Sequence, residues 1–451
     1  MCNKPLVIII GIVLLAIVLA GCGQKEPLTL TISSADSQPG NPNYLTERYK
    51  NAYVILQGET GYYYNAGPSL CLHYYDLATQ KDILLCNKPE CRHDGNEYCA
   101  ATNRKYTPIT FQFYDNAIFA TAYCMDDERL EFKLLRFAPD GSSLTEIATY
   151  YSTSSKNIDE IPIHESIREG RWGFHYLLLH RNKAFLPFSY HPEDMAEGEY
   201  VYGLTELDLS THEMKSVFDM AASRENAPWY NLTAQGDYLY YVQDETSYRH
   251  RLHRRSLLDD SDEILPLVKN FTGSYAVMDD QHVAYIRTDW KQIFVYDQSD
   301  GSNLSGAAYA EKQNPEAAQS NDWLTYIMTN ARKRTLCSDG TYLFVIITTA
   351  LVSYQDFATG QIRYEGQERI LEIHVYDADM NRVCQAFIPH PLVLLGRDPL
   401  EDDSPRSYYN FSLAFTGDQV FMTFKDDIFS SSMEDFLTGK PKFNHLYRRQ
   451  N

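Results

Sequence analysis

Three cysteines and one histidine crowd into a short stretch of this chain, and their side chains are the ones best suited to chemistry. They are Cys86, Cys91, His93 and Cys99. Thiolate and imidazole ligands at such short spacings can surround one tetrahedral metal ion, and three cysteines with one histidine are a known structural zinc set. The spacing is not that of a standard zinc knuckle. The same cysteines could instead form a disulfide, either Cys86 with Cys99 or Cys91 with Cys99.

A further reactive cysteine, Cys22, lies at the end of an N-terminal export signal. Lys4 precedes an apolar run over residues 6–20, and the segment ends on Leu19-Ala20-Gly21-Cys22. The run is shorter than the about 20 residues that a membrane-spanning helix needs. Residues 1–21 therefore resemble the signal peptide of a bacterial lipoprotein precursor. The resemblance implies lipidation of the Cys22 thiol by acyl chains such as palmitate, and a mature protein anchored to the extracytoplasmic face of the cell membrane.

This location bears on the cysteine cluster, because disulfides form and persist outside the cytoplasm. A disulfide is therefore favoured over a zinc ion there, and free thiols are the third alternative. A bound metal would be structural, since four protein ligands leave no open coordination position for catalysis. Cys124, Cys337 and Cys384 lie in or beside apolar strand-like segments, which predicts buried small side chains at these positions.

Composition predicts a folded, acidic, mostly β body. Of the 451 residues, 44% are hydrophobic and 13% aromatic, which favours a packed core made of strands. The formal net charge of −20 becomes −21 once the signal peptide and its single lysine are removed, so the surface would repel nucleic acid and anionic lipid headgroups. Residues 22–47 are rich in Ser, Pro, Gly, Asn and Asp and predict a flexible lipidated tether. Residues 48–451 then form the folded domain.

A degenerate repeat organises this domain. A small or polar turn followed by an aromatic-rich strand occurs seven times, at residues 61–64, 115–119, 182–185, 236–240, 280–285, 339–344 and 417–421. A second strand follows in five copies, at 73–76, 134–137, 205–208, 294–297 and 374–377, and all but the copy at 134–137 end on Asp. The distance along the chain between successive copies fits one four-stranded sheet per copy. Such sheets bury their apolar faces by stacking around a ring. The chain thus resembles the β-propeller superfamily, which implies an all-β ring of seven blades, with six or eight as alternatives.

Within that superfamily the resemblance is to exported propeller lipoproteins of Gram-positive bacteria. Their uncharacterised members carry a similar cysteine and histidine element after the first blade, matched here by Cys86, Cys91, His93 and Cys99. One segment, residues 307–332, departs from the strand rhythm. Trp323, Tyr326 and Ile327 are spaced like one helical face there, which predicts a short helical insertion between two blades.

Other residues favour structural roles. Asp76, Asp208, Asp297 and Asp377 recur at one position of the repeat, which predicts turn-closing side chains rather than catalytic carboxylates. The basic run at 248–255 is interpreted as a solvated outer strand, with an anion or polysaccharide contact as the alternative. Trp172 and Trp229 are expected in the core rather than on a sugar-binding platform.

The expected function is binding rather than catalysis. The sequence contains no G-x-S-x-G, H-E-x-x-H, Walker A or G-x-G-x-x-G motif. We therefore expect a lipid-anchored surface propeller that binds a glycan or protein ligand through loops on one side of its ring, and no nucleic acid. The alternative is a carbohydrate-active hydrolase or lyase, in which carboxylates from different blades meet in the central channel.

Overall fold

The computed structural model describes most of the chain from residue 55 to residue 448. Within that span it leaves out residues 59, 67–70, 94–98, 104, 126–128, 155–176, 191–198, 224–231, 247–248, 269–270, 288–291, 314–332, 349–351, 356–361, 366–368, 390, 397–410, 417 and 425–426. The signal peptide at 1–21, Cys22 and the tether at 22–47 therefore lie outside the described residues. So do Trp172 and Trp229.

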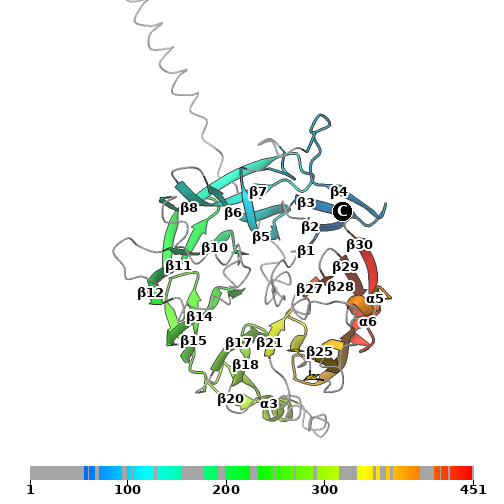
Figure 1. The fold of residues 1–451 in the computed structure, drawn as a ribbon. Coiled ribbons are helices and arrows are strands. Elements are labelled where there is room, and N and C mark those ends of the chain that lie inside the picture. Colours follow the sequence, from blue (N-terminus) through cyan, green and yellow to red (C-terminus); the bar gives the residue numbers. More distant parts are fainter. Residues whose placement is uncertain are drawn as a thin grey trace, which may run out of the picture.

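Seven four-stranded antiparallel sheets stand around a central axis, which makes the protein a seven-bladed β-propeller (Figure 1). The blades are numbered in chain order. Blade 1 consists of β1 (Ile55–Gln57), β2 (Gly61–Ala66), β3 (Cys71–Asp76) and β4 (Lys81–Leu84), and blade 2 of β5 (Thr107–Tyr114), β6 (Ala117–Met125), β7 (Arg129–Phe137) and β8 (Leu144–Ser154). Blade 3 consists of β9 (Leu178–His180), β10 (Lys183–Tyr190), β11 (Glu199–Asp208) and β12 (Met214–Ser223), and blade 4 of β13 (Thr233–Gln235), β14 (Tyr238–Thr246), β15 (Arg249–Ser256) and β16 (Asp262–Ile264).

The last three blades follow the same order, with one insertion. Blade 5 consists of β17 (Phe271–Val277), β18 (His282–Arg287), β19 (Ile293–Asp297) and β20 (Asn303–Ser305). Blade 6 consists of β21 (Lys333–Ser338), β22 (Leu343–Thr348), β25 (Arg369–Tyr376) and β26 (Arg382–Pro389), and blade 7 of β27 (Phe411–Thr416), β28 (Gln419–Phe424), β29 (Asp427–Ser432) and β30 (Asn444–Arg448). A separate hairpin of β23 (Val352–Gln355) and β24 (Ile362–Glu365) is inserted into blade 6. The predicted all-β class and the count of seven blades are confirmed.

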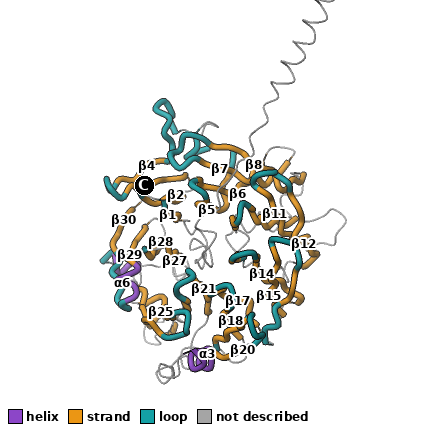
Figure 2. Tube along the Cα trace, turned by 180° about the vertical axis from the view of Figure 1, so that it is seen from behind, coloured by secondary structure: helices purple, strands orange, loops and turns teal. Residues whose placement is uncertain are grey.

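The described helices are short and lie on the outside of the ring. They are α3 (Gly306–Gln313), α5 (Pro391–Leu394) and α6 (Met433–Leu437), of which α3 and α6 stand out at the periphery in the view from behind (Figure 2). Helix α3 begins one residue before the predicted insertion at 307–332 and confirms its first part. The residues on which that prediction rested, Trp323, Tyr326 and Ile327, are outside the described residues.

Tight hairpins join the first two strands of several blades, because their turn residues adopt left-handed backbone conformations. Asp115 and Asn116 have φ of 45° and 51°, and Arg181 and Asn182 have φ of 47° and 61°. Two consecutive positive φ values are the mark of the two-residue type I′ turn, whose twist matches that of the flanking strands. The recurring turn chemistry in the sequence thus fixes where each first strand turns back into the second.

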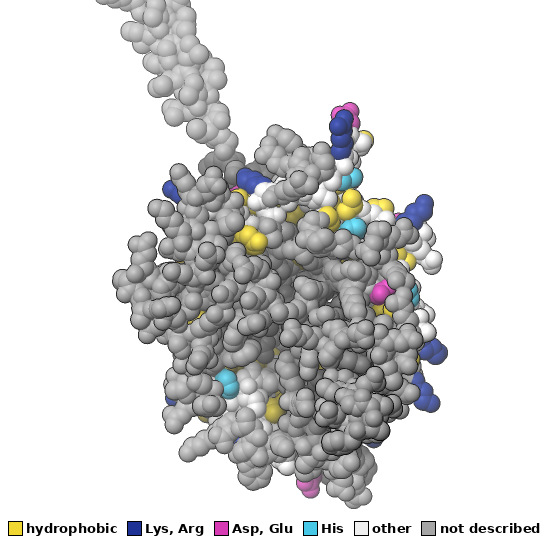
Figure 3. Space-filling view, in the orientation of Figure 1, with side chains coloured by type: hydrophobic (Ala, Val, Ile, Leu, Met, Phe, Trp, Pro, Cys, Tyr) yellow, Lys and Arg dark blue, Asp and Glu magenta, His cyan; other side chains and the backbone are white. Residues whose placement is uncertain are grey.

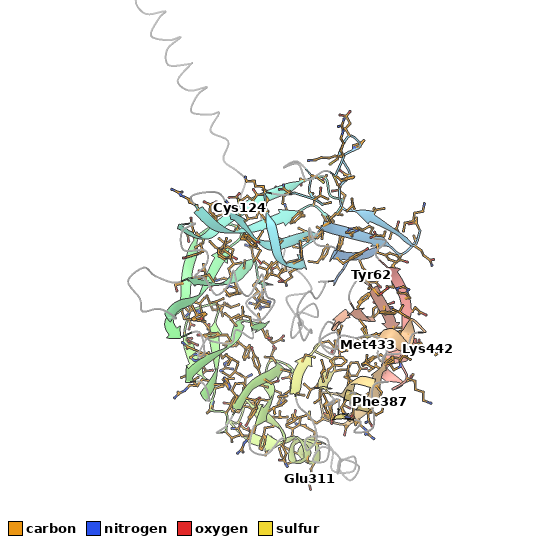
Figure 4. All side chains as sticks on the ribbon, in the orientation of Figure 1. Tyr62, Cys124, Glu311, Phe387, Met433 and Lys442 are labelled. Carbon is orange, nitrogen blue, oxygen red and sulfur yellow. The ribbon has the colours of Figure 1, made fainter. Side chains whose placement is uncertain are left out.

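The core consists of apolar clusters between neighbouring blades. Blades 6 and 7 share a cluster in which Phe344 and Phe415 have ring centroids 4.4 Å apart. The ring closes between blades 7 and 1 at Tyr62, which is labelled in Figure 4. The rings of Tyr62 and Phe421 pack there in a T-shaped arrangement with centroids 4.5 Å apart. Each blade is built from its own consecutive segment of chain, so this closure depends on side-chain packing rather than on a shared strand.

Candidate metal centre

The cysteine and histidine cluster lies on the connection from β4 to β5, and both ends of this connection are hydrogen-bonded to β3. Leu85 N–H donates to Leu72 O at 2.9 Å, and Leu72 N–H donates to Ala101 O at 3.1 Å. Leu85 and Ala100 are buried in the apolar cluster between blades 1 and 2. The backbone therefore enters the loop just before Cys86 and leaves it just after Cys99 at fixed positions.

The four predicted ligand side chains come together. One donor atom each from Cys86, Cys91, His93 and Cys99 can be chosen so that all lie within 4.8 Å of one another. Cys99 is fully buried, at 0% exposure, while the other three are partly exposed. His93 Nδ1 lies 3.5 Å from Cys99 Sγ, so the imidazole is directed into the cluster. Zinc takes thiolate sulfur at about 2.3 Å and imidazole nitrogen at about 2.0–2.1 Å, so closing around an ion requires only small side-chain movements.

Two further features shape the cluster. His93 has a φ of 51°, which is uncommon for a residue with a side chain. The Thr102 hydroxyl donates to Cys99 Sγ at 3.2 Å. A hydroxyl donor to a ligand sulfur is typical of the outer contacts that orient metal ligands.

A turn of blade 2 closes over the loop from outside. Asn87 Nδ2 donates to Asp140 Oδ2 at 3.0 Å. Next to it, Gly141 has a φ of 71°, and a Cβ there would lie 2.6 Å from the carbonyl of Leu85 and 2.7 Å from the amide nitrogen of Cys86. The start of the ligand loop thus packs directly on the backbone of a turn that only glycine fits.

The electrostatics of the cluster favour a bound cation. Burial and the neighbouring thiols of Cys91 and Cys99 raise the pKa of the Cys86 thiol above its ordinary value. Several thiolates cannot ionise side by side unless a positive charge compensates them, and a metal ion is such a charge. The geometry shows a group that could hold a metal.

Three side chains beside this loop form a network that sequence reasoning did not identify. Tyr64 on β2 stacks on His73 of β3 with centroids 5.3 Å apart, and its hydroxyl donates to Asp82 of β4. His73 Nδ1 lies 3.0 Å from Asp82 Oδ2 and donates to the same carboxylate. We call this Tyr64, His73 and Asp82 set the blade 1 latch. It links the second, third and fourth strands of the blade.

Blade 4 repeats the latch at the equivalent positions. Tyr241 stacks on His253 at 4.9 Å and donates to Asp262 Oδ2 at 2.7 Å, while His253 Nδ1 lies 3.2 Å from the same oxygen. Burial acts to raise the pKa of Asp262, but the hydrogen bonds from His253 and Tyr241 outweigh it and hold that pKa below its usual value. A sequence signal exists, because the histidine precedes the aspartate by nine residues in both blades.

The recurring aspartates have the structural role that the sequence predicted. Asp76, Asp208 and Asp297 each end the third strand of a blade, and Asp377 directly follows the third strand of blade 6. Each of the four accepts a hydrogen bond from the backbone N–H two residues later, at 2.8–3.0 Å. These carboxylates close turns between outer strands. Among the described strands, the innermost one of each blade, namely β1, β5, β9, β13, β17, β21 and β27, contains no Asp or Glu.

The basic run is balanced by acidic partners on the same blade. Residues 249–256 form β15, the third strand of blade 4, in which Leu252 is buried and Arg251 exposed. Arg254 pairs with Glu263, and Arg255 Nη2 lies 3.2 Å from Asp260. Strand β15 therefore pairs with the outermost strand β16 and is not itself the outer strand of the blade.

The other sequence predictions have mixed outcomes. Cys337 and Cys384 are buried as predicted, at 7% and 8% exposure, whereas Cys124 is partly exposed. On the side of the ring in Figure 3, the described Lys and Arg side chains lie at the periphery. In the described part of the chain, every helix is too short or too polar to cross a membrane.

Fold and site together define a seven-bladed propeller with a cysteine and histidine cluster at the rim between its first two blades. No protein-family profile matches the chain, and no curated protein matches its sequence. Solved structures resemble it at low identity. A prolyl endopeptidase is 10% identical with a TM-score of 0.49, over 92% of this chain and 51% of that one, so this chain spans about half the length of the peptidase.

Two further structures cover more of their own chains. An uncharacterised protein, lmo1340 of Listeria monocytogenes EGD-e, is 7% identical with a TM-score of 0.40, over 77% of this chain and 84% of that one. The β-propeller domain of the Trilobed protease from Pyrococcus furiosus is 9% identical with a TM-score of 0.38, over 87% of this chain and 94% of that one. At such identities these likenesses concern the fold alone.

Proposed function

We propose that the protein is a lipid-anchored, extracytoplasmic propeller that binds a glycan or protein ligand through one side of its ring. The observation that carries this proposal is the unequal length of the connections on the two sides. Because consecutive strands run in opposite directions, first-to-second and third-to-fourth strand turns share one side of the ring. The second-to-third turns and the links between blades share the other.

The first side is nearly uniform. Most of its turns are short, as at 115–116, 181–182 and 298–302, and the connection that carries α6 is the exception. On the second side, longer stretches of chain separate the strand ends at Ser154, Ser305 and Pro389 from the first strand of the next blade, and the β23 and β24 hairpin is inserted there. Variable connections on a rigid scaffold are where recognition usually resides. We therefore place the ligand on this second side.

The hydrolase or lyase alternative needs carboxylates that converge on the central channel. The described innermost strands supply none, and the recurring aspartates are committed to turns. Binding is the function proposed here, and the hydrolase or lyase stays the alternative that product analysis tests.

Anchoring is tested by metabolic labelling with an alkyne analogue of palmitate. The wild-type chain takes up the label and remains with the membrane fraction, whereas Cys22→Ser does neither. A wild-type chain without label would refute the anchor.

The purified Cys22→Ser protein is then screened on a glycan array, with product analysis of each bound glycan. Binding that is lost on excision of residues 349–368, and kept in a turn-side variant such as Leu258→Ser, supports the recognition side. Cleaved glycan products would favour the enzyme instead.

We also propose that Cys86, Cys91, His93 and Cys99 bind one structural Zn²⁺. Four convergent ligands and a fully buried Cys99 support a closed site that adds stability to the junction of blades 1 and 2. Bound zinc would neutralise the thiolates, and the protein's part is to hold the four ligands and exclude water. A disulfide would use only two of the three thiols and leave the imidazole unused.

Elemental analysis of protein purified without added chelator tests this assignment. We expect about one zinc per chain in the wild type, a loss of zinc in Cys99→Ser, and no loss in the matched control Cys384→Ser, which removes a buried thiol far along the chain. Thiol alkylation under denaturing, non-reducing conditions separates the alternatives. A cluster disulfide without zinc would refute the metal centre.

A further inference from the structure

The blade 1 latch holds the strand that delivers the first metal ligand. Asp82, its acceptor, lies on β4, and Cys86 follows β4 after a single intervening residue, Leu85. The Tyr64 hydroxyl and His73 Nδ1 both bond to Asp82, the latter at 3.0 Å. Asp82 of the latch and Cys86 of the metal cluster are therefore only four positions apart in the chain.

Strand β4 is held at its end by Leu85, which is buried and donates its N–H to Leu72 O, but its own four residues are held mainly by one neighbouring strand. It spans only four residues, Lys81 to Leu84, and pairs with β3 alone at the outer edge of the sheet. Its residues alternate between exposed and partly exposed, and the Ile83 side chain is 50% exposed. An edge strand this short gains little from burial, so its order depends on specific side-chain bonds.

The distribution of latches supports this role. Blades 1 and 4 carry the full latch, and blade 5 carries a variant in which the Tyr285 hydroxyl donates to Asn303 Oδ1 at 2.9 Å. The outermost strands of these blades, β4, β16 and β20, have four, three and three residues, the fewest of the seven outermost strands. In these three blades the bond comes from a tyrosine at the fourth position of the second strand, whereas the longer strand β8 of blade 2 accepts one from Tyr106, which precedes β5.

We propose that Tyr64, His73 and Asp82 are positioning residues for the metal centre, which fix β4 so that Cys86 is already in place when the ion binds. This inference rests on the zinc site proposed above. If β4 frays, ion binding must also order the strand, and the entropy of that ordering is subtracted from the affinity. Among the described residues, the latch of blade 4 has no metal-ligand group beside it, so it serves as an internal control.

The test compares Tyr64→Phe with Tyr241→Phe, because each removes one hydroxyl from one copy of the same latch. Zinc affinity is measured by competition with a chromophoric chelator, and global stability by urea unfolding of the same samples. We expect Tyr64→Phe to bind zinc about tenfold more weakly, in the range known for groups that orient metal ligands. Tyr241→Phe should lose a similar amount of stability yet keep its zinc affinity within about twofold.

Hydrogen exchange of the metal-free proteins provides a readout that needs no zinc. Amides of residues 81–86 should exchange about tenfold faster in Tyr64→Phe and unchanged in Tyr241→Phe. Equal zinc affinity in both variants, an equal loss in both, or unchanged exchange at 81–86 would each overturn the positioning role. A wild-type protein that binds no zinc would instead refute the metal centre itself, before the variants are compared.

Discussion

Substituting Gly141 by alanine tests the contact between blade 2 and the metal loop. At a φ of 71° any residue with a Cβ pays about 1–2 kcal/mol for the left-handed conformation. The new Cβ would also lie 2.6 Å from the Leu85 carbonyl, which is backbone and cannot rotate away. Overpacking of this kind costs about 1–3 kcal/mol, so the expected loss in unfolding free energy is about 2–5 kcal/mol.

Gly301 provides a matched control for that experiment. It has the same φ of 71° in the equivalent turn of blade 5, and its added Cβ would meet nothing within 4 Å. Urea unfolding should therefore show a loss of only about 1–2 kcal/mol for Gly301→Ala. Zinc content should fall in Gly141→Ala alone, because the clash displaces Cys86. Equal destabilisation of the two variants, with zinc retained in both, would show that the turn does not press on the loop.

Three other outcomes are expected. Phe344→Ala should cost about 3–5 kcal/mol in urea unfolding, because the ring is fully buried against Phe415, whereas the exposed Val383→Ala should cost under about 0.5 kcal/mol. The hydrogen bond to Asp279 raises the pKa of His282, so its contribution to stability is complete below about pH 6.5 and declines as pH rises through the raised value. Between pH 5.5 and 8.5 the wild type should lose roughly 0.5 kcal/mol more than His282→Gln, and equal losses would contradict this coupling. A chelator that removes zinc should lower the thermal midpoint of the wild type and leave that of Cys99→Ser unchanged.

Much of the fold could be predicted from the sequence, because propeller blades are specified locally. Turns such as Asp115-Asn116 set the hairpins, and aromatic strands set the faces that must be buried. The Cys86 to Cys99 cluster was predictable for the same reason, since its ligands are close in sequence. The latch was not, because Tyr64, His73 and Asp82 come from three strands and meet only through the register of the sheet.

The sequence by itself determined the turn residues and aromatic strands of the blades, the all-β class and the presence of a cysteine and histidine group. Each of these depends on residues that are close together along the chain. Tertiary structure decided between the predicted seven blades and the alternatives of six or eight, and it decided the closure of the ring at Tyr62 and Phe421 and the contact of Gly141 with Leu85. These are contacts between segments far apart in the chain. Their existence depends on how neighbouring blades pack, which no local pattern encodes.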